Sequence, residues 1–142
     1  MDMDAFTGRL PPAWADMSAL DVLYLDYNSL SGPLPPAWSS ITQLQLLSLH
    51  FNNFTGTLPP QWSGMTALNS LALAGNTLTG TIPPTWTAMT HLSGLLLVSN
   101  LGLCGPVPAG SLTEALSACC GVTNATSGTQ LGMACASSAP GI

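Results

Sequence analysis

Residues 56–79 read GTLPPQWSGMTALNSLALAGNTLT, and variants of this 24-residue unit recur along most of the chain. Three residue types return at the same step without a slip. These ladders are Gly8, Gly32, Gly56 and Gly80; Trp14, Trp38, Trp62 and Trp86; and Asn28, Asn52, Asn76 and Asn100. A proline pair recurs with the same step, beginning at Pro11 and Pro12. A fixed period of this length indicates a solenoid, in which each repeat buries its apolar side chains only against its neighbours.

Each repeat contains a short alternating stretch that predicts one strand. Leu23 and Leu25 flank a single residue, so both leucines face the same side. Stacked copies of this stretch predict a parallel sheet with strands about 4.8 Å apart. The ladder asparagine follows the strand, where its amide can bond the backbone of the turn and of the neighbouring coil.

The proline pair predicts a different structure on the opposite side of the coil. Proline fixes φ and removes a backbone donor, so we expect extended segments and short 3₁₀ turns there. On the same argument, neither a second regular sheet edge nor a long helix is expected. The ladder tryptophan is predicted to pack inward.

The repeat resembles the plant-type extracellular leucine-rich repeat, L-x-x-L-x-L-x-x-N-x-L-x-G-x-I-P. Two instances are Leu20-Leu23-Leu25-Asn28-Leu30-Gly32 and Leu68-Leu71-Leu73-Asn76-Leu78-Gly80. Tryptophan after a doubled proline departs from that pattern and is similar to variants in some green-algal and protist surface proteins. The resemblance implies an α/β leucine-rich-repeat solenoid that is right-handed, with a parallel β-sheet on the concave side and 3₁₀ or extended segments on the convex side.

The periodicity divides the chain into repeats, a cysteine-bearing cap and a tail. The predicted segments are a repeat region 1–103, made of a partial repeat 1–7 and coils 8–31, 32–55, 56–79 and 80–103; a C-terminal cap 104–135; and a tail 136–142. The first residues align with the inside of a repeat, which predicts either a fragment or a minimal cap formed by residues 1–8. Within the C-terminal cap, a short helix is expected with Ser111 as its N-cap and Glu114 in the capping-box position.

The C-terminal third holds the four cysteines, Cys104, Cys119, Cys120 and Cys135. An even number in one segment predicts a cap closed by two disulfides, and four cysteines allow three pairings. Because adjacent cysteines rarely pair with each other, Cys119 and Cys120 are expected to bond separately to Cys104 and Cys135. The alternative is four reduced thiols in a cytosolic protein.

Two N-x-[ST] tripeptides, beginning at Asn53 and Asn124, are candidate glycosylation sites if the chain is secreted. With 15 serines and 15 threonines in 142 residues, such tripeptides also arise by chance.

Charge is scarce, and this excludes several classes of function. Charged residues make up 5% of the chain, Arg9 is the one basic residue, and the net charge is −5. Binding to nucleic acid needs clustered Lys and Arg, so it is excluded. The chain contains no run of 18 consecutive apolar residues, so no membrane span is predicted. Residues 1–4 do not resemble a secretory signal. No cofactor site and no metal site is predicted, since His50 and His91 lie in different columns.

The concave face is the predicted binding site because its outward positions are free of packing roles. Its N-terminal half carries aromatic and titratable side chains, and the candidate ligand-binding residues are Tyr24, Asp26, Tyr27, Ser48, His50 and Phe51. Asp26 and His50 occupy one column in adjacent coils, so their side chains are expected to touch. Ser48 nearby permits a Ser-His-Asp interpretation. On an open sheet these residue types are far more often a binding face, so no enzyme is predicted.

The resemblance implies an extracellular module of a receptor-like or cell-wall-associated protein that binds a protein, a peptide or a cell-wall glycan. The second hypothesis is an intracellular scaffold in the cytoplasm or associated with the cytoskeleton. A remote third is an ice-binding or structural surface protein. It is suggested by hydroxyl columns at Ser18, Thr42, Thr66 and Thr90, and at Ser31, Thr55 and Thr79. Local bonding of these hydroxyls to the backbone explains the columns more simply.

Overall fold

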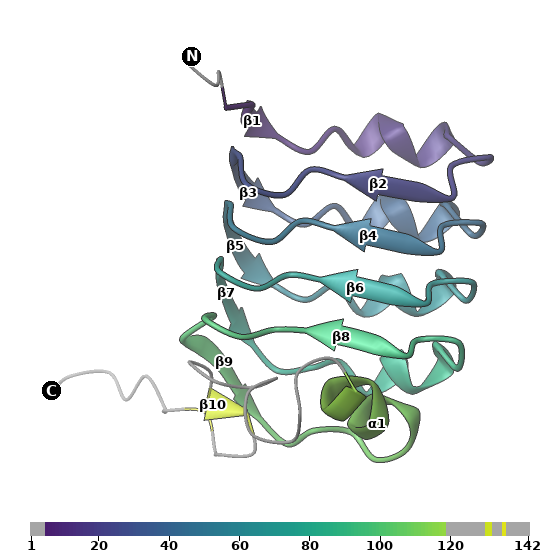
Figure 1. The fold of residues 1–142 in the computed structure, drawn as a ribbon, viewed down its shortest axis with the longest axis vertical. Coiled ribbons are helices and arrows are strands. Elements are labelled where there is room, and N and C mark those ends of the chain that lie inside the picture. Colours follow the sequence, from purple (N-terminus) through teal and green to yellow (C-terminus); the bar gives the residue numbers. More distant parts are fainter. Residues whose placement is uncertain (1–4, 119–129, 132–134, 136–142) are drawn as a thin grey trace, which may run out of the picture.

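The computed structural model describes residues 5–118, 130–131 and 135. The repeats form stacked coils, and each coil contributes one strand to a four-stranded parallel sheet (Figure 1). The strands of this concave sheet are β2 (Val22–Tyr24), β4 (Leu46–Ser48), β6 (Ser70–Ala72) and β8 (Gly94–Leu96). Leu23, Leu47, Leu71 and Leu95 lie side by side across it. The predicted leucine-rich-repeat solenoid is confirmed.

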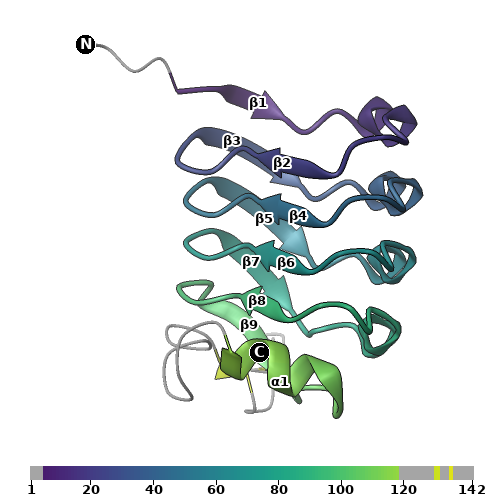
Figure 2. The ribbon, with the colours of Figure 1, turned by 45° about the vertical axis from the view of Figure 1, so that its right-hand side comes forward.

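A second parallel sheet runs along the stack, and here the prediction from the prolines is wrong. Its strands, in spatial order, are β1 (Thr7–Arg9), β3 (Ser29–Pro33), β5 (Asn53–Thr57), β7 (Thr77–Gly80), β9 (Gly102–Gly105) and β10 (Gln130–Leu131). Each strand from β3 to β7 ends before the proline pair of its coil, so the ladder uses N–H groups that the prolines do not remove. Figure 2 shows the two sheets meeting at the loop that follows each concave strand.

The proline pairs start four 3₁₀ helices on the far side of the coils, as predicted. They are η1 (Pro12–Asp16), η2 (Pro36–Ser40), η3 (Pro60–Gly64) and η4 (Pro84–Ala88). In each, the second proline is the first helical residue, where its fixed φ suits the helix and its missing N–H costs no bond.

The ladder tryptophans form a continuous stack inside these turns. Trp38, Trp62 and Trp86 are fully buried and Trp14 is half-buried, so inward packing is confirmed for the inner coils. Neighbouring rings lie 5.9, 6.5 and 6.3 Å apart and within 12° of parallel. The indole N–H of Trp62 donates to the carbonyl of Pro35, in the preceding coil, at 2.9 Å. The indole groups of Trp38 and Trp86 make the same bond to the first proline of the coil before their own. The stack therefore joins each coil to the one before it.

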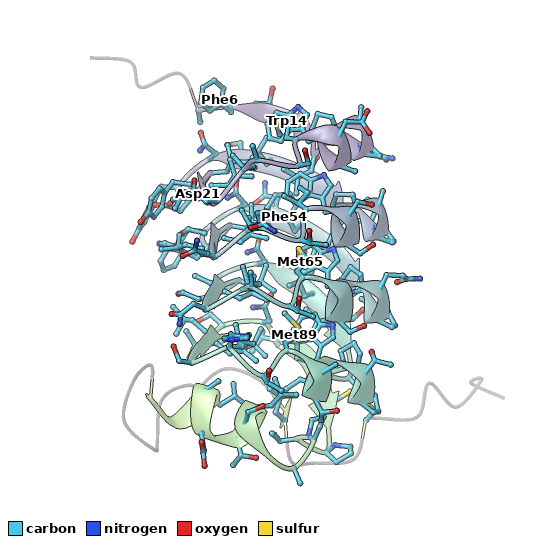
Figure 3. All side chains as sticks on the ribbon, turned by 90° about the vertical axis from the view of Figure 1, so that its right-hand side faces the viewer. Phe6, Trp14, Asp21, Phe54, Met65 and Met89 are labelled. Carbon is cyan, nitrogen blue, oxygen red and sulfur yellow. A yellow bond between two sulfur atoms is a disulfide. The ribbon has the colours of Figure 1, made fainter. Side chains whose placement is uncertain are left out.

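The remaining interior is filled by leucine, methionine and phenylalanine. Phe54, Met65 and Met89 lie within successive coils between the sheets and the 3₁₀ helices (Figure 3). At the N-terminal end, Phe6 is exposed and Trp14 half-buried, although Trp14 corresponds to tryptophans that are fully buried in later coils.

The asparagine ladder clamps coil to coil. In Asn76, Oδ1 accepts the amide of Phe54 at 3.0 Å, and Nδ2 donates to the carbonyls of Leu49 at 3.1 Å and Leu73 at 3.0 Å. Asn52 and Asn100 repeat this set of bonds with their own neighbours. Each inner asparagine therefore satisfies backbone groups of two coils at once.

Within the C-terminal cap, α1 (Ser111–Ala118) packs Leu112, Ala115 and Leu116 against the last coil. Ser111 is the first helical residue instead of the predicted N-cap, a position that Gly110 takes by accepting the amide of Thr113 at 3.0 Å. Glu114 lies in the first turn, one residue beyond the capping-box position that follows from Gly110 as N-cap, so that prediction is wrong.

Among the described residues one disulfide closes the cap, and its pairing differs from the prediction. Cys104 is bonded to Cys135, so neither is available to Cys119 or Cys120. The parallel pairing of β10 with β9 explains this, since it brings Leu131 beside Gly105 and Cys135 close to Cys104. Cys119 and Cys120 lie outside the described residues.

We predict that Asn76→Ala lowers the free energy of unfolding by about 3 kcal/mol, because the buried amide of Phe54 loses its acceptor. Urea unfolding followed by tryptophan fluorescence measures this loss. The control Asn69→Ala, at an exposed side chain, should change the value by less than about 0.5 kcal/mol. A loss in Asn76→Ala no larger than the small loss expected for Asn69→Ala would show that the hydrogen bonds of Asn76 add nothing to stability.

Peptide mapping of the non-reduced protein should recover Cys104 linked to Cys135. Replacing both by serine should destabilise the cap by about 3–4 kcal/mol, because the disulfide closes a loop with a sequence separation of 31. The matched control, serine at both Cys119 and Cys120, should leave that link in place. A peptide joining Cys104 to either control cysteine would contradict the structure.

Candidate functional site

The candidate site lies at the end of the concave strands, where the residue before each ladder asparagine has a left-handed backbone. The φ values are 55° at Tyr27, 52° at Phe51, 64° at Gly75 and 59° at Ser99. The amides of Tyr27, Phe51 and Gly75 each donate to the next coil, at 3.0, 2.8 and 2.9 Å. The repeat therefore imposes this conformation, which suits glycine but costs a bulky side chain about 1 kcal/mol or more.

Tyr27 and Phe51 occupy this costly conformation and form an exposed aromatic surface. Their rings stack with centroids 4.8 Å apart and an interplanar angle of 28°. The Phe51 ring continues over Gly75, where an added Cβ would lie 2.5 Å from Cδ1 of Phe51. Tyr27 remains 67% exposed and Phe51 47% exposed. We call the rings of Tyr27 and Phe51 the aromatic pair.

Polar side chains support the aromatic pair from the strand side. His50 stands edge-on to Tyr27 at 5.1 Å and to Phe51 at 5.4 Å between ring centroids. Its Nδ1 bonds the hydroxyl of Ser48 at 2.8 Å, and its Nε2 lies 3.7 Å from the carboxylate of Asp26. The predicted contact between Asp26 and His50 is confirmed, at a distance that permits electrostatic attraction but exceeds a hydrogen bond. Together these contacts fix the orientation of the imidazole.

The Ser48, His50 and Asp26 contacts resemble the order of a catalytic triad, but the serine is poorly placed for attack. Ser48 is only 5% exposed, in the middle of a packed sheet. A nucleophile needs open access to the substrate and donors for the developing oxyanion. Ser48 therefore holds His50 from within the sheet. It is not part of the exposed surface, although the sequence predicted it as a ligand-binding residue.

The rest of the concave face adds a third exposed aromatic ring. Tyr24 is exposed on β2, two residues before Asp26, and Val22 is also exposed on that strand. In the third coil, Ala74 is buried. The role of Gly75 as the floor beneath Phe51 was missed. Its place in the same 24-residue column as Tyr27 and Phe51 is the signal that could have revealed it.

The other sequence candidates lie away from this face. Asn53 is exposed at the start of β5 and is accessible for glycosylation, whereas Asn124 lies outside the described residues. The hydroxyls of Thr77 and Thr79 donate to carbonyls of the neighbouring strand β5, at 2.9 and 3.3 Å, which explains part of the hydroxyl-rich second sheet. His91 binds the carbonyl of Thr66 through Nδ1 at 3.0 Å.

Two further properties concern the described part of the chain alone. Within it, no three His, Cys, Asp or Glu side chains gather as a metal site would require. None of its helices has the length and apolar character needed to cross a bilayer.

A hollow of about 420 Å³ opens at the N-terminal end of the stack, lined by apolar residues that include Leu10, Trp14 and Leu30. Trp14 stacks on Trp38, and the next coils use the same positions to pack against a preceding coil. The hollow is therefore part of the stacking surface between coils and is separate from the concave site.

Comparison with known proteins agrees with this architecture. Residues 19–41 and 43–65 match the Leucine Rich Repeat family model. A search of curated protein sequences finds no match.

Among similar solved structures, the SOBIR1 receptor kinase ectodomain from Arabidopsis thaliana has a TM-score of 0.75 and 27% identity, over 91% of this chain and 67% of its own. The BIR3–SERK2 complex from the same plant has a TM-score of 0.75 and 31% identity, over 88% and 63%. The plant peptide hormone receptor RGFR1 in complex with RGF2 has a TM-score of 0.75 and 26% identity, over 88% of this chain. The chain spans only 19% of RGFR1 and 16% of the matched chain in the similar PEPR1–AtPEP1 structure.

The aromatic pair should be dispensable for folding. In Tyr27→Gly, relief of the left-handed backbone offsets the lost ring stacking, so we expect the free energy of unfolding to change by less than about 1 kcal/mol. In the control Phe54→Ala, at a fully buried ring, the loss should be about 3–5 kcal/mol. Urea unfolding of both variants makes the comparison. A loss in Tyr27→Gly as large as that of the control would mean that the ring serves the fold.

Proposed function

We propose that the chain is a non-catalytic recognition module that binds an extended peptide, or a peptide segment of a protein, across the aromatic half of its concave sheet. The observation that carries the proposal is the aromatic pair, held in a left-handed backbone that glycine would occupy at lower cost. Local strain of this kind is kept where a site uses it. Exposed aromatic rings are also the side chains that most often dominate protein contacts.

The rigidity of the coils supports the same function. The strands beneath the site are tied at both ends by backbone bonds to adjacent coils, and the buried asparagines lock the turn behind them. A preformed surface loses little conformational entropy when it binds. This favours a site that accepts a flexible ligand without rearranging.

Similar structures supply the ligand class and the compartment of the proposal. RGFR1 is described as a plant peptide hormone receptor and was solved with RGF2, and PEPR1 was solved with AtPEP1. SOBIR1 and BIR2 are represented by ectodomains. By analogy, we place this chain outside the cell or at its surface, in a receptor-like or cell-wall-associated protein, where the Cys104–Cys135 disulfide would persist.

The test is a selection of short unstructured peptides displayed as a library against the immobilised protein, with counter-selection against Tyr27→Gly/Phe51→Gly. We expect the selected peptides to bind this double variant at least about tenfold more weakly, equivalent to about 1.4 kcal/mol. The matched control is Phe6→Ala, since Phe6 is an equally exposed ring beside β1 of the other sheet. Its affinity should stay within about twofold of the unmodified protein.

Peptides that bind the double variant and the unmodified protein equally would place the site elsewhere and end the proposal. A neutral oligosaccharide that binds in place of peptides, with the same loss in the double variant, would assign the aromatic pair to glycan recognition instead.

A further inference from the structure

Resting on the proposed function, we infer that the bound peptide presents a positively charged side chain, arginine or lysine, to the aromatic pair beside Asp26. A cation is attracted to the face of an aromatic ring, and the attraction grows when a carboxylate lies next to it. The concave face brings such a carboxylate to the aromatic pair through His50, since Asp26 lies 3.7 Å from Nε2 of His50 and the His50 ring lies 5.1 Å from that of Tyr27.

The charges around the concave face favour a ligand with positive charge. Asp26 retains about a quarter of its side-chain exposure. Asp21, immediately before β2 in the same coil, is exposed and adds a second negative charge near the strand. Within the described part of the chain, His50 is the one side chain capable of positive charge that contacts Asp26, and it does so at 3.7 Å. An acidic ligand would be repelled by both carboxylates at this face.

The chain itself supplies no lysine or arginine to the position beside Asp26 and the aromatic pair. Arg9 is its only basic residue, and the Arg9 side chain lies over Gly32, where an added Cβ would approach it to 2.9 Å. That contact belongs to β1 and β3 of the second sheet. The face therefore combines exposed rings with a carboxylate that has no lysine or arginine beside it, and His50 is its one described contact capable of positive charge. A ligand cation would complete this arrangement.

The polar contacts behind the rings give Asp26 and His50 separate roles. Ser48 holds His50 through Nδ1, so the imidazole edge stays against both rings while its Nε2 faces Asp26. We assign Asp26 and Tyr27 to contact with the cation. His50 and Ser48 are positioning residues, which keep the rings and the carboxylate in register.

The first measurement is a double-mutant cycle on a peptide recovered by the selection. Its arginine is replaced by citrulline, which keeps the shape but removes the charge, and the protein is changed by Asp26→Asn. Each change alone should weaken binding about tenfold, and the two together should weaken it little more than either. Asp16→Asn is the charge-matched control, since Asp16 is exposed on η1, and it should leave affinity within about twofold.

The second measurement does not depend on the selection. Short capped glycine–serine peptides with arginine, citrulline or glutamate at the centre are titrated while the ring resonances of Tyr27 and Phe51 are followed by NMR. We expect shifts that saturate with the arginine probe, and no saturation with the citrulline or glutamate probe. In Asp26→Asn, the arginine probe should lose most of its effect.

The outcomes separate this inference from the proposed function. Selected peptides that need the aromatic pair but tolerate citrulline would keep the peptide-binding function and overturn the cation. Arginine and citrulline probes that act alike would overturn it as well. Selected peptides that ignore the aromatic pair would overturn the proposed function itself, and the inference would fall with it.

Discussion

The asparagine ladder is the interaction on which the rest of the structure depends. Each coil leaves backbone groups at the end of its concave strand that cannot join either sheet, because the chain turns there. A buried amide side chain carries an acceptor and two donors, so it can satisfy a turn and the preceding coil together. Asn76 does this with the amide of Phe54 and the carbonyls of Leu49 and Leu73. A hydrophobic residue there would leave those groups unpaired away from water.

The same ladder generates the functional surface. To aim its amide inward, each asparagine must follow a residue with a left-handed backbone, and that residue points its side chain outward beside the sheet. In the third coil the position is filled by Gly75, which needs no compensation. In the first two coils it is filled by Tyr27 and Phe51, whose cost is met by the surrounding backbone bonds. Structure and recognition are therefore coupled through one turn conformation.

Tryptophan and proline solve the stacking problem on the opposite side. A doubled proline ends the extended segment and starts a 3₁₀ helix, and the carbonyl of its first proline accepts both the tryptophan amide of its own coil and the indole N–H of the next coil. The indole N–H is a donor that must be paired when it is buried. The Pro-Pro-x-Trp unit thus provides both the donor and the acceptor, and the repeat step makes each coil the partner of the next.

Most of the fold could be predicted from the period, because a 24-residue unit present in four copies restricts every coil to the same backbone path. The concave sheet, the 3₁₀ helices, the inward tryptophans and the contact of Asp26 with His50 all followed from residue type and column. The second sheet did not follow from the prolines, because the strand in each coil ends before the proline pair begins. The Cys104–Cys135 bond and the exclusion of Ser48 from the surface did not follow either.

The sequence by itself determined the coil, since leucine, asparagine and proline at a constant step satisfy the same bonds in every repeat. Tertiary structure alone decided which outward residues meet. Tyr27, Phe51 and Gly75 lie 24 residues apart, and only the stacking of coils brings two rings to 4.8 Å and places the second over a glycine. Likewise, β10 must pair with β9 before Cys135 can reach Cys104. Distances across the stack depend on packing between coils, and a pattern within one coil does not contain them.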